Sequence, residues 1–172
     1  MISVTFFTMC IIRGKNDSKV VVESESETEE KAVIIKEEEI VEETNEKWTI
    51  EIPAISLIAD ISEGTSTETL NKYVGHFELT PKKEGNIGLA AHNRGYSVNY
   101  FENLKKLQGG EEIIYKCEEF IKTYVVVKNI KISDEDWSYL ENSNQNQITL
   151  ITCIENEPQY RRCVQAIEKE EN

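Results

Sequence analysis

Histidine and cysteine are both scarce in this 172-residue sequence, which contains two histidines and four cysteines. No CxxC pair or other zinc-type spacing occurs, so neither a zinc site nor another metal site is expected. Small secreted disulfide scaffolds are much richer in cysteine, so at least one thiol is expected to be free. Any chemistry that pairs a thiol with an imidazole must use His76 or His92. The cysteines are Cys10, Cys117, Cys153 and Cys163.

Positive charge is also in short supply, with 19 Lys and Arg against 32 Asp and Glu, a formal net charge of −13. Nucleic-acid binding relies on clustered Lys and Arg, so a nucleic-acid partner is not expected. Docking on an anionic lipid surface through a basic patch is excluded for the same reason. A phosphate-binding loop is missing too, because Gly109–Gly110 lacks the required lysine and spacing. No cofactor is therefore expected.

The longest apolar run at the N-terminus, "MISVTFFTMCII", has about a dozen residues, against roughly 20 needed to cross a bilayer. It lacks the basic n-region of a signal peptide. Residues 1–15 are either the remnant of a membrane anchor that begins upstream or a loose N-terminus, and we favour the anchor remnant. Residues 16–47 are strongly acidic, with no proline, glycine or aromatic residue, which is typical of a solvated stalk or linker.

From Trp48 onward the sequence is rich in short alternating or buried runs typical of β-strands. A strand over 48–61 is broken at Pro53, and "GNIGLAAHN" predicts a buried strand that ends in a polar turn. Short helices are expected at 64–75, with Thr67 as N-cap, and at 100–110. Many strands and few helices indicate a mostly-β barrel or sandwich over residues 48–169. The other predicted strands cover 111–117, 120–132, 147–153 and 161–168, and a capping box is expected at Ser133 and Asp136.

Cys153 ends the predicted strand "QITLITC" and is followed by the polar residues "IENEPQY", which predict a loop over 154–160. A strand end beside a loop holds a side chain rigidly while leaving it accessible, which suits a nucleophile. A free cysteine is also a common small core residue. Position alone does not separate these two interpretations.

The other candidate residues are His92, the turn residue Asn93, and the pair Arg161 and Arg162. His92 follows a strand of small apolar residues and suits an acid, a base or a structural role, whereas His76 looks packed and structural. Neighbouring residues on a strand point to opposite faces, so at most one of the two arginines faces the side that carries Cys153. Such an arginine can lower a thiol pKa or stabilise an oxyanion, and the alternative is a surface ion pair.

Taken together, "TLITC", an arginine that opens a final strand, and "GLAAHNRG" some 60 residues earlier resemble the sortase family. The resemblance extends through "IEIPAISLIADISEGTSTETL" and "VGHFELTPKKEGNIG" and covers about residues 50–167. It implies a closed, eight-stranded β-barrel with a few short helices, tethered by an N-terminal anchor on the outer surface of a Gram-positive cell. The implied partners are proteins with an LPxTG-like sorting signal and an amine of a cell-wall precursor.

The resemblance implies that Cys153 is the nucleophile, His92 the acid that protonates the leaving amine, and Arg161 the group that stabilises the oxyanion. Arg161 is preferred because Ala166 matches the small residue that follows the family's R-x-V-V-x strand, and Arg162 is then expected to point away. The residues implied to line the substrate groove are Thr149, Leu150, Thr152 and Asn93.

The lack of a D-P-aromatic lid motif and of a long insertion over 133–147 argues against two other classes, and the short loop over 154–160 and the compact barrel make class D the most similar group, with class A next. Two alternatives remain at this point. One is a thiol hydrolase that uses the same Cys–His pair with water as the acceptor. The other is a sortase-like barrel that only binds a peptide.

Overall fold

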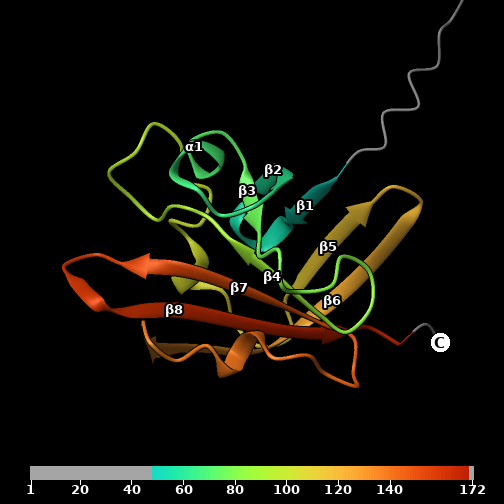
Figure 1. Ribbon diagram of the computed structural model, residues 1–172. Helices are drawn as coiled ribbons and strands as arrows, with labels where there is room; N and C mark the ends of the chain where they lie inside the picture. The colour runs from blue at the N-terminus through green and yellow to red at the C-terminus, as the bar shows by residue number, and fades with distance from the viewer. Residues whose placement is uncertain (1–47, 171–172) are drawn as a thin grey trace, which may run out of the picture. The chain divides into compact units, whose positions relative to one another are not determined.

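The computed structural model describes residues 48–170, which form a closed eight-stranded β-barrel (Figure 1). The predicted anchor remnant at 1–15 and the acidic stalk at 16–47 lie outside the described residues. The strands are β1 (Thr49–Ile52), β2 (Leu57–Glu63), β3 (Val74–His76), β4 (Asn86–Ala90), β5 (Glu112–Cys117), β6 (Phe120–Ser133), β7 (Gln147–Ile154) and β8 (Glu157–Glu168).

Around the barrel the strands follow the order β1-β2-β3-β4-β7-β8-β6-β5, and β5 pairs back with β1. The β2–β3 and β4–β7 pairs are parallel, and the others are antiparallel. The prediction of a closed, mostly-β barrel is confirmed. The last two strands are inserted between β4 and β6, which places β7 directly beside β4.

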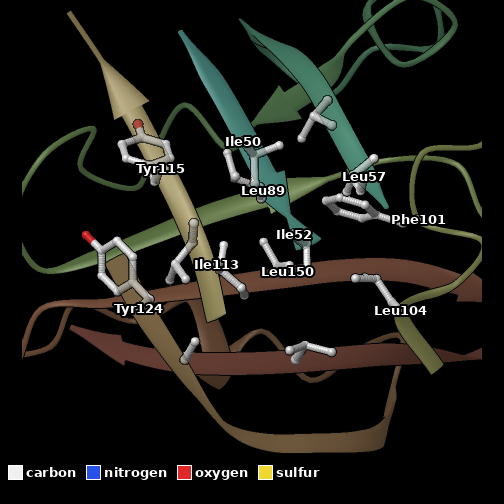
Figure 2. Packing of buried hydrophobic residues seen from close by; sticks show 14 of the residues in the cluster. Ile50, Ile52, Leu57, Leu89, Phe101, Leu104, Ile113, Tyr115, Tyr124 and Leu150 are labelled. Atoms are coloured by element: carbon white, nitrogen blue, oxygen red, sulfur yellow. The ribbon is translucent and has the colours of Figure 1, made fainter. Parts of the chain in front are cut away.

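The barrel interior is filled by the alternating apolar residues that the strand patterns predict. Ile113 and Tyr115 on β5 are fully buried, while their neighbours along the strand are partly exposed. Two residues of the β4–β5 connection, Phe101 and Leu104, also enter this core (Figure 2). Burying a side chain of this size contributes about 1.5–3 kcal/mol. The connection is therefore fixed to the barrel by its own apolar side chains.

The predicted break in the first strand occurs at a single 3₁₀ turn, η1 (Pro53–Ile55). Proline has no backbone N–H and cannot continue the ladder of hydrogen bonds. Ser56 then adopts a left-handed conformation with φ of 54°, and its N–H donates to the Pro53 carbonyl at 3.0 Å. The chain reverses direction here and β2 pairs back on β1.

The first predicted helix is present but shorter, and its N-cap differs by one residue. Helix α1 (Thr67–Leu70) is capped by Ser66, whose Oγ accepts from the Thr69 N–H at 3.2 Å. The prediction of Thr67 as the cap was wrong. Ser and Thr have similar cap preferences, so two adjacent hydroxyls do not define the helix start to a single residue.

The other helical segments are single 3₁₀ turns. Within the predicted helix 100–110 only η2 (Leu104–Lys106) is helical, and it ends before Leu107, whose backbone is extended. The capping box at Ser133 and Asp136 is also absent. Asp136 Oδ1 instead accepts from the N–H and hydroxyl of Ser138, which starts the turn η3 (Ser138–Leu140).

The predicted loop at 154–160 is instead a tight hairpin turn. Strand β7 continues to Ile154, only Glu155 and Asn156 form the turn, and β8 begins at Glu157. Asn156 has a φ of 60°, a left-handed conformation that asparagine tolerates better than most residues. The hairpin therefore extends past Cys153, and the two strands lie side by side in Figure 1.

Candidate active site

Cys153 is the exposed thiol of the described domain. It lies near the end of β7, after five buried residues that anchor the strand. Cys117 and Cys163 are both free and buried. Burial raises the pKa of the Cys117 thiol and raises that of Cys163 to about 12, so both resist ionisation. Among the described residues, Cys153 is therefore the thiol that a substrate can reach.

His92 lies two residues beyond the end of β4, beside the end of β7. The parallel register of β4 and β7 ends at Ala90 and Ile151, so His92 and Cys153 each lie two residues beyond the last paired position. The Thr152 hydroxyl donates to the Ala91 carbonyl at 2.7 Å, which keeps the two segments in contact just before these residues. The imidazole and the thiol thus belong to adjacent strand ends.

The His92 ring is covered by Tyr96. The two rings stack with centroids 3.5 Å apart and planes inclined by 4°. Burial lowers the pKa of His92 below its ordinary value of 6.5. Its Nε2 atom is buried and has no hydrogen-bond partner among the described residues. Such an unpaired polar atom costs free energy and often marks a position where a ligand supplies the partner.

The two arginines occupy opposite faces of β8. Arg161 is the Cα partner of Cys153, and Arg162 is the partner of Thr152. The Arg161 guanidinium donates to the carbonyl groups of Pro158 and Tyr160, at 2.6 and 2.8 Å. It also lies 3.8 Å from an Asp134 carboxylate oxygen. Arg161 is therefore opposite Cys153 in the strand register, but its guanidinium is bonded to carbonyl groups near the hairpin turn.

Arg162 differs from the expectation that it points away. It lines a cavity of about 600 Å³ together with Asn93, Thr152 and Cys153. Leu150 and Val164 are cross-strand partners in the core. Arg162 lies two positions before Val164 on β8, so its side chain points to the same inner face, near the end of the barrel. The β4–β5 connection forms the opposite wall, with Phe101 at its base.

Two of the four residues predicted to line the substrate groove lie elsewhere. Thr149 is fully buried, and its hydroxyl donates to Asn86 Oδ1 at 2.8 Å. Leu150 is fully buried in the barrel core. Both expectations are corrected, because neither side chain reaches a surface on which a peptide can bind. Thr152 and Asn93 do line the cavity.

A second hollow, the apolar groove, has a volume of about 490 Å³ and lies over the outer face of β4. Its large side chains include Phe77, Leu79 and Trp137, and the last two are 101% and 58% exposed. Gly88 forms the sheet beneath, where an added Cβ would lie 2.8 Å from Leu140 and 3.1 Å from Phe77. The missing side chain lets the flanking loops pack closely on the sheet.

His76 is structural, as the sequence indicated. The residue is 1% exposed, its Nδ1 lies 2.8 Å from a Glu63 carboxylate oxygen, and its Nε2 lies 3.1 Å from the Thr80 hydroxyl. Its ring also packs against that of Trp48. These contacts occupy both ring nitrogens, so His92 is the histidine with an unpaired nitrogen.

Sequence reasoning missed Tyr96, the cavity residues Lys105 and Lys106, and the apolar groove. Tyr96 sits in a polar turn held by Asn99, whose amide donates to the Tyr96 carbonyl at 2.8 Å. An aromatic residue four positions after a candidate histidine was the available signal. Nothing in the sequence marked the two lysines, since they belong to a segment that was expected to be an ordinary surface helix.

The chain belongs to the sortase family, because the family model of the sortase domain matches residues 50–169. Sortases are cysteine transpeptidases of Gram-positive bacterial surfaces. Sortase A of Bacillus anthracis is 27% identical over 118 residues, which cover 68% of this chain and 56% of that protein.

Solved sortase structures share the fold. The pilus-related Sortase C of Group B Streptococcus matches with a TM-score of 0.68 and 26% identity, covering 73% of this chain and 69% of that one. A Clostridium perfringens Sortase D5 transpeptidase matches with a TM-score of 0.64 and 29% identity, covering 72% and 79%. Relatives of more than one class are thus similar to this chain.

Two further features are absent from residues 48–170. No group of three or more His, Cys, Asp or Glu side chains in this part of the chain is arranged to hold a metal ion. No helix in the same residues has the length and apolar character needed to span a bilayer.

Proposed function

We propose that this protein is a sortase transpeptidase that cleaves an LPxTG-like sorting signal through a thioester at Cys153. The acyl group is then transferred to an amine of the cell wall. One observation carries the proposal: Cys153 is paired with Arg161 across β7 and β8, and His92 follows the end of β4, the strand beside β7.

The chemistry follows from these three groups. The Cys153 thiolate attacks the peptide carbonyl carbon, so an S–C bond forms while the C–N bond breaks. His92, as the imidazolium, gives its proton to the leaving amine. An acceptor amine then attacks the thioester, which forms a new amide and releases the thiolate, and His92 takes up the proton that the acceptor loses. The unpaired Nε2 of His92 suits this exchange.

The apolar groove is the proposed site for the Leu-Pro end of the signal. Gly88 beneath the groove pairs with Thr149, which lies on the same face of β7 as Cys153. The four residue steps from Thr149 to Cys153 span about 13 Å, the length of a four-residue extended peptide. A leucine near Phe77 and Trp137 would thus place the carbonyl of the fourth residue at the thiol.

Arg161 lies on this same face and is the proposed oxyanion donor. Its guanidinium has to leave the Pro158 and Tyr160 carbonyl groups, which are solvent-accessible acceptors that water can satisfy. Arg162 faces the cavity instead.

The proposal is tested by the intact mass of the purified protein after incubation with LPxTG-like and LPxTA-like peptides. An adduct equal to the N-terminal fragment is expected, and Cys153→Ala should abolish it. Addition of an amine should release the adduct as an amide. If no peptide forms an adduct while a small reagent still labels Cys153, the substrate class is wrong.

The roles of the two arginines are separable. Arg161→Ala should slow acylation at least ~10²-fold, as expected for loss of an oxyanion donor. Arg162→Ala should slow acylation only mildly. Single-turnover rates of adduct formation measure both, and a reversed order would assign the oxyanion role to Arg162.

A thiol hydrolase is the alternative function, because Cys153 is exposed and water can reach a thioester there. Product analysis with and without an amine separates the two activities. A barrel that only binds peptides would form no adduct.

Class D is the proposed group within the family. The β6–β7 connection carries only the three-residue turn η3, and the Sortase D5 structure is among the similar chains. We also propose that the domain spans 48–169, that 16–47 is an acidic stalk, and that 1–15 is an anchor remnant. The domain would then face outward from the membrane of a Gram-positive cell.

A further inference from the structure

The domain has a second hollow besides the apolar groove that is proposed for the sorting signal. The apolar groove lies on the outer face of the sheet, whereas the 600 Å³ cavity opens at the barrel mouth, between the β4–β5 connection and the end of β7. Cys153 itself lines the cavity. A second substrate in the cavity can therefore reach the thioester while the acyl chain still fills the groove.

The cavity carries positive charge in a chain whose net charge is −13. Most other described Lys and Arg side chains have an acidic partner within 4.0 Å, but Lys105, Lys106 and Arg162 have none. The fourth cation of the lining, Arg94, is paired with the carboxylate of Glu155. These three cations have only one unpaired carboxylate beside them in the lining.

That carboxylate is Glu102, whose Oε1 accepts a 3.4 Å hydrogen bond from the Asn103 amide. It does not form an ion pair with any described Lys or Arg. The lining as a whole therefore keeps an excess of positive charge near the thiol.

The backbone that carries the two lysines is fixed. Leu104 is fully buried and Phe101 is 1% exposed, and both point into the core (Figure 2). The Asn129 amide of β6 donates to the carbonyl groups of Leu104 and Leu107, at 2.9 and 2.7 Å. The Asn129 Oδ1 atom also faces an Arg162 nitrogen at 3.5 Å. The Asn129 side chain thus contacts both the turn that carries the two lysines and Arg162.

The positive charges of the cavity affect the protonation of the acceptor amine, and an amine is a nucleophile only in its neutral form. Nearby cations disfavour the ammonium form and so favour the reactive free base. The same cations repel an acceptor that is positively charged overall. An acidic group next to the amine resolves these two opposing effects of the cations. The lysines bind its negative charge, while the amine stays neutral.

We propose that this cavity is the acceptor site, and that Lys105 and Lys106 select an amine that carries a carboxylate or phosphate close to it. This inference rests on the proposed transpeptidase function. The bond changes are those of the second step: the acceptor nitrogen bonds to the thioester carbon, the S–C bond breaks, and the amine proton goes to His92.

The test uses three acceptors on one diamine skeleton: lysinamide, lysine and diaminopimelate, with zero, one and two carboxylates. The purified chain is acylated with the sorting peptide, and the ratio of amide to hydrolysed product is measured for each acceptor. A carboxylate next to the attacking amine should raise the ratio about 3- to 5-fold over lysinamide, the scale of one exposed ion pair. Added salt should weaken the preference.

The double variant Lys105→Gln/Lys106→Gln should bring the three acceptors within about 2-fold of each other. Lys83→Gln/Lys169→Gln is the matched control, since it removes two charges from half-exposed lysines outside the cavity and should keep the preference. Comparing one acceptor across variants cancels differences in amine basicity, and the product ratio cancels differences in acylation.

Three outcomes would overturn the inference. Equal use of the three acceptors by the unmodified protein rules out selection of an acidic group. An unchanged preference in the Lys105→Gln/Lys106→Gln variant assigns selection to other residues. Absence of any acyl-enzyme, seen directly by mass, removes the proposed function and this inference together, and so differs from the first two results.

Discussion

At the residue scale, neighbouring cysteines have opposite environments. Cys163 is the cross-strand partner of Ile151, two positions before Cys153, yet it is fully buried while Cys153 is exposed. Burial raises the pKa of the Cys163 thiol to about 12 and also raises that of Cys117. The thiolate is the reactive form, so burial lowers the reactivity of Cys117 and Cys163 in two ways: it hides the thiols and it raises their pKa.

We therefore expect iodoacetamide at neutral pH to label Cys153 at least ten-fold faster than Cys117 or Cys163, in proportion to exposure and thiolate fraction. Peptide mapping of the labelled native protein measures the three rates. Denatured protein is the control, in which the three rates should converge. A slower rate at Cys153 than at the two buried thiols would favour the peptide-binding alternative.

Tyr96 is expected to set the protonation of His92 through the stacked rings. Tyr96→Ala exposes the imidazole, so the pKa of His92 should rise toward 6.5, whereas Tyr96→Phe keeps the stack and should leave it lowered. NMR titration of the His92 ring protons measures both variants. An unchanged pKa in Tyr96→Ala would assign the desolvation to other neighbours.

The lowered pKa of His92 also makes the stability of the protein depend on pH. The pKa of His92 is lower in the folded protein than in the unfolded chain, so its contribution is present above pH 6.5 and is lost as the pH falls through the folded pKa. Urea unfolding at pH 7.5 and pH 5 should therefore show a smaller loss on acidification in Tyr96→Ala than in Tyr96→Phe.

At the element scale, Asn86 connects β4 to the β6–β7 connection. Its side-chain amide donates to the carbonyl groups of Tyr139 and Glu141, both at 2.8 Å, and its Oδ1 accepts from Thr149. Tyr139 belongs to η3, whose next residue, Leu140, lines the apolar groove. The buried amide thus positions one wall of the groove.

Asn86→Ala should lower the free energy of unfolding by about 1–3 kcal/mol, because buried partners lose their hydrogen bonds. It should also raise the KM for the sorting peptide more than it lowers kcat. Urea titration and steady-state kinetics measure the two effects. Asn142→Ala is a control on an exposed residue of the same connection, and an equal effect there would contradict the role of Asn86.

Most strands were predictable from the sequence, but β3, whose first two residues lie in the predicted helix 64–75, and most of the turns were not. Alternation of apolar residues is a local property, so the patterns of β4 to β8 predicted those strands within a few residues. The hairpin turn at Glu155–Asn156 and the 3₁₀ turn η2 depend on long-range pairing and on burial of Leu104. Local propensity does not contain that information.

The candidate site divides in the same way. Cys153 and His92 became candidates because they follow clear strand patterns and match a family motif, and their roles stay predictions. The buried positions of Thr149 and Leu150 were missed because a motif does not state which way each side chain points. Lys105 and Lys106 were missed because the cavity forms only when the β4–β5 connection folds against β7.

At the scale of the whole molecule, the strand order links the reactive thiol to completion of the barrel. β7 and β8 are the last strands of the domain in sequence, yet they fill the gap between β4 and β6. They also supply Ile148, Leu150 and Val164 to the core. Until they insert, both β4 and β6 have an unpaired edge.

This order has a consequence for biosynthesis. A nascent chain whose last two strands have not yet been synthesised has neither a closed barrel nor Cys153. A complete but unfolded chain has the thiol, but His92 is not held near it. Contacts between segments so distant in sequence form late in folding. Translation and folding thus leave the candidate site unassembled in every chain that lacks its last two strands.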